Sequence, residues 1–272
     1  MVLRCAAGAA LFAAFAASAQ PQRPLDAVAP EPVPAPPATA IRFTPPDESA
    51  IPNSPLGDMI RFGRDVFVDT QRYAKKYVGN GLNCQNCHLD AGRQANSAPL
   101  WAAYVAYPAF MAKNRRVDTF AQRLELCFRF SMNGRMPPAD DAVAVGLVSY
   151  AYWLATGAPV GAQLAGRGFP ALPEPALAPD VKRGAGVYDM HCVACHGANG
   201  GGLKEGATYT FPPLWGRDSY NAGAGMHRVP TAAAFIKANM PLGQGGTLTD
   251  QQAWDVAAYM NSHPRPVVRV RP

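Results

Sequence analysis

Two short segments of the chain share the pattern Cys-x-x-Cys-His, and this pattern restricts the fold more than any other feature. The segments are CQNCH, which begins at Cys84, and CVACH, which begins at Cys192. Two cysteines about one helical turn apart can bond to the two vinyl groups on one edge of a porphyrin, and the adjoining histidine then faces the iron. The chain is therefore expected to hold covalently bound haem c at both positions.

A zinc centre is the main alternative, because Cys-x-x-Cys also supplies half of a tetrahedral zinc site. Neither segment has a second cysteine pair to complete such a site, and the two motifs lie 108 residues apart. We therefore predict two haem c groups. The predicted attachment residues are Cys84, Cys87, Cys192 and Cys195, and the predicted proximal iron ligands are His88 and His196.

The first residues have the features of a secretory signal. Arg4 is the positive residue, an apolar run follows, and Ala17-Ser18-Ala19 is a small-residue cleavage site. Because the run is too short for a permanent span, we predict a signal peptide over 1–19 and a periplasmic mature protein without a membrane span. Residues 20–46 contain nine prolines and are expected to form an extended, mostly disordered leader.

Helical patterns surround each motif. Residues 47–157 and 180–265 are predicted to be two tandem, all-α cytochrome c domains of the class I-like type, joined by a Gly/Ala/Pro-rich linker over 158–179. Strand signals are weak throughout. Helices are expected over 59–77, from an N-cap at Asp118 to Gly134, from Asp140 to Gly157, and from an N-cap at Thr249 with Gln252 completing a capping box.

The formal net charge is +6. Such an excess favours anionic partners or acidic redox proteins through long-range attraction, although a generally basic surface accounts for it equally well. The chain has no compact Lys/Arg run with interleaved aromatic residues. We therefore predict no nucleic-acid partner.

The second iron needs a sixth ligand, and Met240 is the preferred candidate. It lies 44 residues after His196 and is followed by Pro241. A methionine ligand raises the reduction potential, which suits a haem from which electrons leave. The alternatives are that Met240 is a core residue and that Lys237 binds the iron in one redox state.

For the first iron, spacing leaves two candidates open. Met136 lies 48 residues after His88 and is followed by proline, whereas Cys127 lies 39 residues after His88. Cys127 is the one thiol left over from six cysteines, once Cys5 is removed with the signal and four bind haem. An unused thiol in an oxidising compartment requires an explanation.

Helical spacing places Arg123 and Ser131 four residues either side of Cys127, on one face. A cation and a hydroxyl beside a thiol suit anion binding, and they favour the thiolate that binds metal and attacks sulfur. The alternative is that Cys127 is a small apolar packing residue.

Four segments resemble the dihaem thiosulfate dehydrogenases: GNGLNCQNCHLDAGR, SAPLWAAYVAYPAF, CFRFSMNGRMPP and FIKANMPLGQGGTLTDQQAWDVAAYMNSHPRP. The resemblance extends from about residue 55 to 266. It implies two cytochrome c domains, with His88 and Cys127 on the first iron and His196 and Met240 on the second. Residue 239 is Asn, so no lysine stands directly beside the methionine.

The resemblance also implies the catalytic residues. Cys127, Arg123 and Ser131 match the family's thiol, basic and hydroxyl positions. A further basic position falls in the segment AKNRR. Lys113 and Arg116 are the residues we predict there, with Arg115 as the third candidate.

The implied reaction couples two thiosulfate ions to tetrathionate, and electrons pass from the first haem to the second. The acceptor is expected to be a small cytochrome c or a high-potential iron–sulfur protein. Tetrathionate reduction would use the same site in reverse. Two alternatives remain: a non-enzymatic dihaem electron carrier with Met136 on the first iron, and a sulfur-oxidation cytochrome that loads thiosulfate onto a carrier protein.

Overall fold

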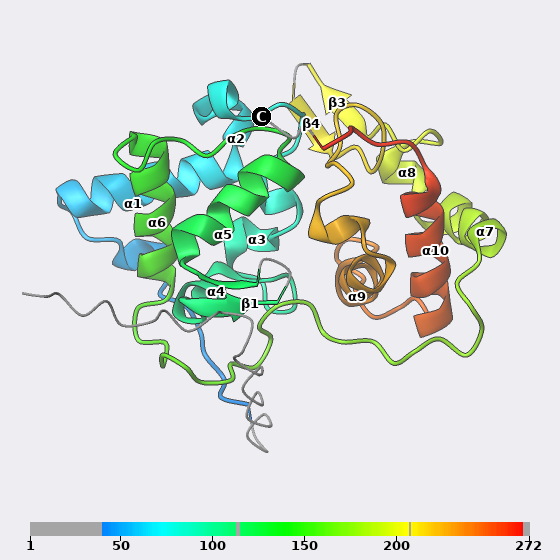
Figure 1. The fold of residues 1–272 in the computed structure, drawn as a ribbon, viewed down its shortest axis with the longest axis horizontal. Coiled ribbons are helices and arrows are strands. Elements are labelled where there is room, and N and C mark those ends of the chain that lie inside the picture. Colours follow the sequence, from blue (N-terminus) through cyan, green and yellow to red (C-terminus); the bar gives the residue numbers. More distant parts are fainter. Residues whose placement is uncertain (1–39, 113–114, 207, 269–272) are drawn as a thin grey trace, which may run out of the picture. The chain divides into compact units, whose positions relative to one another are not determined.

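Helices form most of the regular structure in the computed structural model, which describes residues 40–112, 115–206 and 208–268 (Figure 1). The predicted signal peptide and most of the predicted leader lie outside these residues. The helices are α1 (Pro55–Val68), α2 (Thr70–Tyr73), α3 (Leu89–Gly92), α4 (Leu100–Val105), α5 (Phe120–Leu126), α6 (Ala142–Leu154), α7 (Val181–His191), α8 (Val193–His196), α9 (Val229–Asn239) and α10 (Asp250–Ser262).

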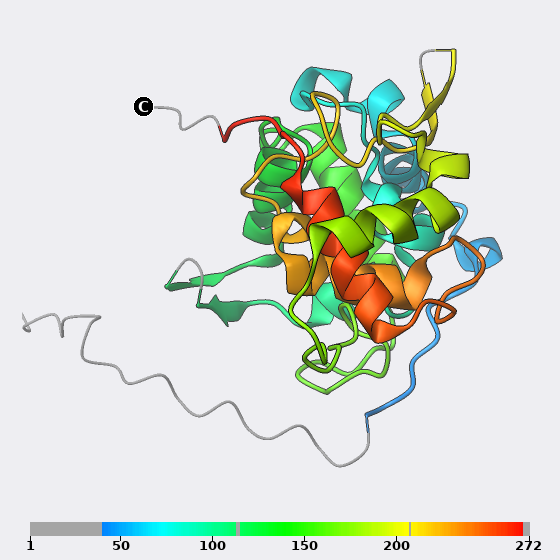
Figure 2. The same cartoon turned by 90° about the vertical axis from the view of Figure 1, so that its right-hand side faces the viewer.

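Two short antiparallel hairpins interrupt the helical structure, and the weak strand signals did not predict them. One pairs β1 (Ala109–Met111) with β2 (Arg116–Asp118), and the other pairs β3 (Leu203–Glu205) with β4 (Thr208–Phe211). The first hairpin projects from the helices (Figure 2), with Phe110 and Val117 exposed. The helical fold class is otherwise as predicted.

In the first half, α1 and α6 cross at two glycines. A Cβ atom added at Gly63 would lie 1.9 Å from the carbonyl oxygen of Gly146, so the two backbones touch at this point. Ile60 and Val66 of α1 and Tyr150 of α6 are fully buried beside the crossing. Removing such side chains from water provides most of the packing energy of the pair.

The second half repeats this arrangement with α7 and α10 (Figure 1). A Cβ atom added at Gly184 would lie 2.1 Å from the carbonyl oxygen of Asp255. Arg183 donates to the Asp255 carboxylate at 2.8 Å, which fastens the same crossing. In each half, a helix that precedes the Cys-x-x-Cys-His motif thus packs on the last helix of that half. Separate hydrophobic clusters form the two cores.

Residues 40–46 pack against the first core, in contrast to the extended leader predicted over 20–46. The backbone of Ile41 donates to Gln163 and accepts from Ala165. The ring of Phe43 lies 5.6 Å from that of Trp101. The predicted leader therefore extends too far, and the other domain boundaries stay predictions.

Three predicted helix limits need correction. The helix predicted over 59–77 is interrupted at Asp69, whose side chain caps α2. Thr119, not Asp118, caps α5, because Thr119 forms a capping box with Gln122. The helix predicted from Asp140 to Gly157 is α6, which begins after its N-cap Asp141 and ends at Leu154. The capping box predicted at Thr249 is confirmed.

The α5 helix changes at its end into a π-helical turn, Cys127–Ser131. Such wide turns occur mainly as single interruptions of α-helices, often at functional sites. Within the described part of the chain, no helix has the length and apolar character that a bilayer crossing requires.

Candidate active site

A cavity in the first half brings together the first Cys-x-x-Cys-His motif and the turn that carries Cys127. His88 enters from the motif, and Arg123, Cys127 and Ser131 enter from α5 and the π-helical turn. Apolar side chains form most of the remaining wall. They include Phe67, Leu82, Leu100, Phe120, Leu124, Phe128 and Leu147.

Both motif histidines are held in the same way. The Nδ1 atom of His88 lies 2.7 Å from the carbonyl oxygen of Ala98, and that of His196 lies 2.9 Å from the carbonyl oxygen of Pro212. A histidine that donates from Nδ1 keeps Nε2 as the atom available to a metal. Burial lowers the pKa of His196, which favours the neutral imidazole that binds iron.

The two acceptor carbonyls share a sequence signal that we did not use. Ala98 stands directly before Pro99, and Pro212 stands directly before Pro213. In each half, the carbonyl oxygen that holds the motif histidine therefore belongs to a residue that directly precedes a proline. The repetition in both halves supports an equivalent role for the two histidines.

The thiol of Cys127 lies against two basic groups. The Nη1 atom of Arg123 is 3.4 Å from Sγ. Burial raises the pKa of Cys127, but the charge of Arg123 and a hydrogen bond with His88 outweigh it and lower the value to about 7. The surroundings of Cys127 thus favour the thiolate, which is the nucleophilic and metal-binding form.

The cysteines of the first motif behave differently. Burial raises the pKa of Cys84 to about 11 and that of Cys87 to about 12. Thr70 donates a hydrogen bond to the sulfur of Cys84 at 3.3 Å. The same cavity therefore holds two protonated thiols and one thiol whose charge is stabilised.

Tyr107 is a site residue that we did not predict, although it stands in the segment YVAYPAF. It lines the cavity, and its side chain is hydrogen-bonded to Arg123. The nearby Cys127 raises the pKa of Arg123, so this guanidinium keeps its charge. Tyr107 thereby helps to direct the guanidinium at the thiol.

Two of the residues considered in the sequence analysis lie apart from this group. Arg116 is in β2 and pairs with Asp118 at 2.6 Å, and it is not among the residues that line the cavity. Met136 lines a different pocket. Lys113 lies outside the described residues, and Arg115 is in the turn beside it, with a φ of 52°.

At the second motif, Met240 directly follows α9 and packs against the second core, as does Cys192. Lys237 is engaged elsewhere. Its Nζ atom donates to the carbonyl oxygen of Leu248 at 2.5 Å and pairs with Asp250 at 3.2 Å. These contacts oppose Lys237 as an iron ligand.

Asn239 connects the two halves. It is 3 % exposed, its Nδ2 atom donates to the carbonyl oxygen of Asn96 at 3.1 Å, and its Oδ1 atom accepts from Gln94 at 2.8 Å. The loop that it contacts is the one whose Ala98 carbonyl holds His88. The residue beside Met240 is therefore tied to the support of the first histidine.

Comparison with known proteins places the chain in a family. Residues 181–264 match the family model of cytochrome c. The chain is 56% identical over 224 residues to a thiosulfate dehydrogenase of Stutzerimonas stutzeri, covering 82% of this chain and 73% of that protein. The chain belongs to the thiosulfate dehydrogenase family. The resemblance predicted from four sequence segments is thereby confirmed.

Further members of the thiosulfate dehydrogenase family support this assignment. The enzyme of Thiomonas intermedia is 53% identical over 262 residues, which cover 96% of this chain and 83% of that protein. The solved structure of a thiosulfate dehydrogenase, TsdBA, from Marichromatium purpuratum in its as-isolated form superimposes with a TM-score of 0.79 at 52% identity. The match covers 83% of this chain and half of that chain.

The residues at both motifs fit haem c. Each motif has a histidine whose Nδ1 is bound to a carbonyl oxygen, so that Nε2 is available to iron. Among the residues that the structure describes, no cluster of three or more His, Cys, Asp or Glu side chains could hold a bare metal ion. The cysteine pair and the available Nε2 at each motif are the groups that covalent haem c attachment uses.

Proposed function

We propose that this protein is a periplasmic dihaem thiosulfate dehydrogenase, which couples two thiosulfate ions to tetrathionate and can run in reverse. One observation supports this most strongly. Cys127 lies in the cavity of the first motif histidine, 3.4 Å from the Arg123 guanidinium. A thiolate and a cation in one largely apolar cavity are the groups that this chemistry requires.

Each motif would bind one haem c, through Cys84 and Cys87 in the first half and through Cys192 and Cys195 in the second. In the first half, His88 and Cys127 would bind the iron. Met136 is the less suitable ligand, because it lines a pocket that shares no residue with this cavity. In the second half, His196 and Met240 would bind the iron, which gives an electron-exit haem of higher potential.

The substrate charge determines what the protein residues must do. Two thiosulfate dianions repel each other, so a fixed cation is needed where they meet. Arg123 supplies this charge and stabilises the Cys127 thiolate. Ser131 lines the same cavity and would donate a hydrogen bond to a sulfonate oxygen. Arg116 and Lys113 would contribute charge from the β1–β2 hairpin.

Cys127 would couple the two thiosulfate ions in two steps. First, the thiolate of Cys127 and one thiosulfate form a sulfur–sulfur bond, and two electrons leave. Then the outer sulfur of a second thiosulfate attacks that adduct, tetrathionate departs, and the thiolate of Cys127 is restored. The haems, when bound, would accept these electrons one each, and the second would pass them to an external redox protein.

The test is an assay of the purified haem-loaded protein with thiosulfate and ferricyanide, without any carrier protein. We expect one tetrathionate for every two ferricyanide ions reduced. Cys127→Ala should lower the rate at least about 100-fold, because the nucleophile is lost, and Met136→Leu should stay near the wild type. Full activity of Cys127→Ala would refute the mechanism. An absence of free tetrathionate would point instead to an electron carrier or to a cytochrome that loads a carrier protein.

A further inference from the structure

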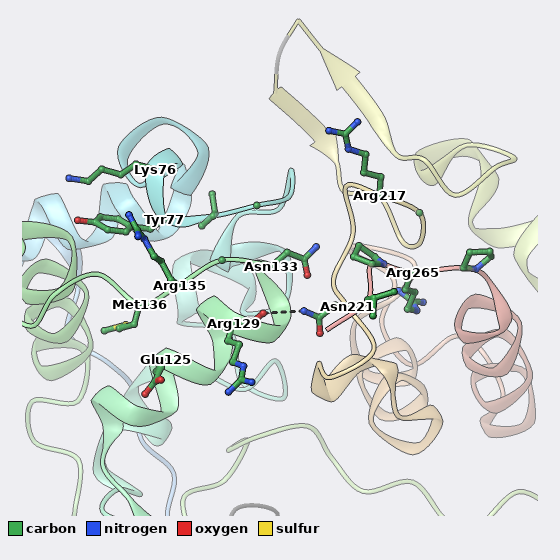
Figure 3. Close-up of a pocket in the computed structure, with 17 residues that line it drawn as sticks. Lys76, Tyr77, Glu125, Arg129, Asn133, Arg135, Met136, Arg217, Asn221 and Arg265 are labelled. Carbon is green, nitrogen blue, oxygen red and sulfur yellow. Dashed lines mark hydrogen bonds between the residues drawn. The ribbon is translucent and has the colours of Figure 1, made fainter. Parts of the chain in front are cut away.

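A second pocket, of about 1060 Å³, lies beside the π-helical turn and is lined by residues of both halves (Figure 3). It shares no lining residue with the cavity of His88 and Cys127. The proposed function does not use it. It is formed by residues 76–79, by side chains of α5 and the segment that follows it, by residues 216–221 and by residues 264–267.

The pocket is strongly basic. Five cations line it and Glu125 is the one acid among its lining residues; the cations are Lys76, Arg129, Arg135, Arg217 and Arg265. Arg129 and Arg135 contact aromatic rings, those of Phe130 and Tyr77. Within the described ranges, neither these two nor Arg217 forms an ion pair.

The wall of the pocket is held in place. Asn221 donates to the carbonyl oxygen of Arg129 at 3.0 Å, which joins the two halves at this point (Figure 3). Arg265 donates to the carbonyl oxygen of Leu214 at 2.8 Å. Its Nε atom is buried without a hydrogen-bond partner in the described structure, and the same holds for Oδ1 of Asn133. Buried polar atoms of this kind normally have a partner.

Unpaired cations around one pocket repel one another, and an anionic partner relieves this repulsion. The volume exceeds that of most small-ligand pockets, so a single small oxyanion would contact only part of the wall. Val267 is 84% exposed and adds an apolar surface at the rim. Charged groups around a small apolar contact suit a transient complex between redox proteins.

We propose that this basic pocket docks the acidic face of the redox protein that accepts the electrons. The inference rests on the proposed function and names the surface through which its electrons leave. Arg265 of the pocket donates to the carbonyl oxygen of Leu214, two residues after Pro212, whose carbonyl oxygen holds His196. A partner at the pocket would therefore lie beside the segment that supports the histidine of the electron-exit haem.

The test measures binding and turnover separately. The probe is cytochrome c whose lysines have been succinylated, which makes it acidic, and unmodified basic cytochrome c is its counterpart. Calorimetry with the haem-loaded protein should show binding of the acidic probe only, weakening steeply between low and physiological salt. These measurements on the wild-type protein already decide the matter. Equal binding of both probes, or binding that salt does not change, would overturn the proposal.

The variant removes the three unpaired charges together, as Arg129→Gln, Arg135→Gln and Arg217→Gln. A matched variant removes three exposed arginines elsewhere, as Arg61→Gln, Arg72→Gln and Arg228→Gln. We expect the first to weaken binding of the acidic probe at least about tenfold and the second less than about threefold. Equal effects would contradict a localised docking site.

Turnover with ferrocenium, a small cationic oxidant that the pocket does not attract, tests the proposed function independently. If wild-type protein binds the acidic probe but does not oxidise thiosulfate with ferrocenium, the proposed function fails and the docking site stands. If the triple variant instead raises KM for thiosulfate with ferrocenium, the pocket is a substrate site and the docking proposal is wrong.

Discussion

Replacement of Arg123 by methionine should disable the thiol without removing it. Methionine keeps much of the side-chain volume but has no charge. The Arg123 Nη1 atom lies 3.4 Å from the sulfur of Cys127. At that distance, and with an effective dielectric constant of about 20, a pair of opposite unit charges attracts by about 5 kcal/mol.

Burial opposes part of this attraction, and the net result is a pKa for Cys127 of about 7 instead of 9.0. That difference corresponds to about 2.7 kcal/mol. When Arg123 is absent, burial is opposed only by the interaction with His88, so the pKa should rise. The thiolate fraction at pH 7, about one half in the wild type, then falls about tenfold for each unit of that rise.

The assay is the initial rate of tetrathionate formation between pH 5 and 10. Because the active form is the deprotonated one, wild-type activity should rise with pH through about 7 and level off above it. In Arg123→Met the rise should move to higher pH, and kcat/KM at pH 7 should fall at least about tenfold. The matched control is Arg72→Met, whose guanidinium lies over the ring of Tyr73 on the surface. Activity of Arg123→Met within threefold of wild type, with an unchanged pH profile, would refute this reasoning.

Three further substitutions test other parts of the structure. Asn239→Leu removes the hydrogen bonds to the loop that supports His88. A spectroelectrochemical titration should therefore show a shifted reduction potential of the first haem. A shift confined to the second haem would contradict a connection between Asn239 and His88. Gly63→Ala should lower the free energy of unfolding by at least about 2 kcal/mol, because the added Cβ meets backbone of α6. Gly186→Ala is its control, since a Cβ there has no neighbouring atom within 4 Å. Equal melting temperatures of the two variants would contradict the close backbone contact between α1 and α6. Lys237→Gln should leave the absorption spectrum of the second haem unchanged, and a loss of its ligand band would show that Lys237 binds the iron.

Much of the site could be predicted because its residues depend on local spacing. The Cys-x-x-Cys-His motifs place their own histidines, and four-residue helical spacing brought Arg123 to Cys127 as expected. The capping box at Thr249 is equally local. At α5, Asp118 and Thr119 are adjacent and both suit an N-cap. Thr119 is used because Gln122 stands at the position that completes its capping box.

The remaining features depend on contacts between distant residues, which no local pattern encodes. Asn239 is a satisfied bridge only because residues 94–96 approach it from the other half. Residues 40–46 are ordered because the predicted linker pairs with Ile41. Spacing left Met136 and Cys127 both open for the first iron, whereas the fold places Met136 at another pocket. Tyr107 was missed for the same reason, since its role depends on Arg123.

The central claim is that Cys127, and not Met136, would bind the iron of the first haem together with His88. Electron paramagnetic resonance of the oxidised, haem-loaded protein tests it most directly, because a thiolate ligand and a thioether ligand give different low-spin signals. We predict a thiolate-type signal in wild type that is lost in Cys127→Ala and retained in Met136→Leu. A signal that persists in Cys127→Ala and disappears in Met136→Leu would contradict the account.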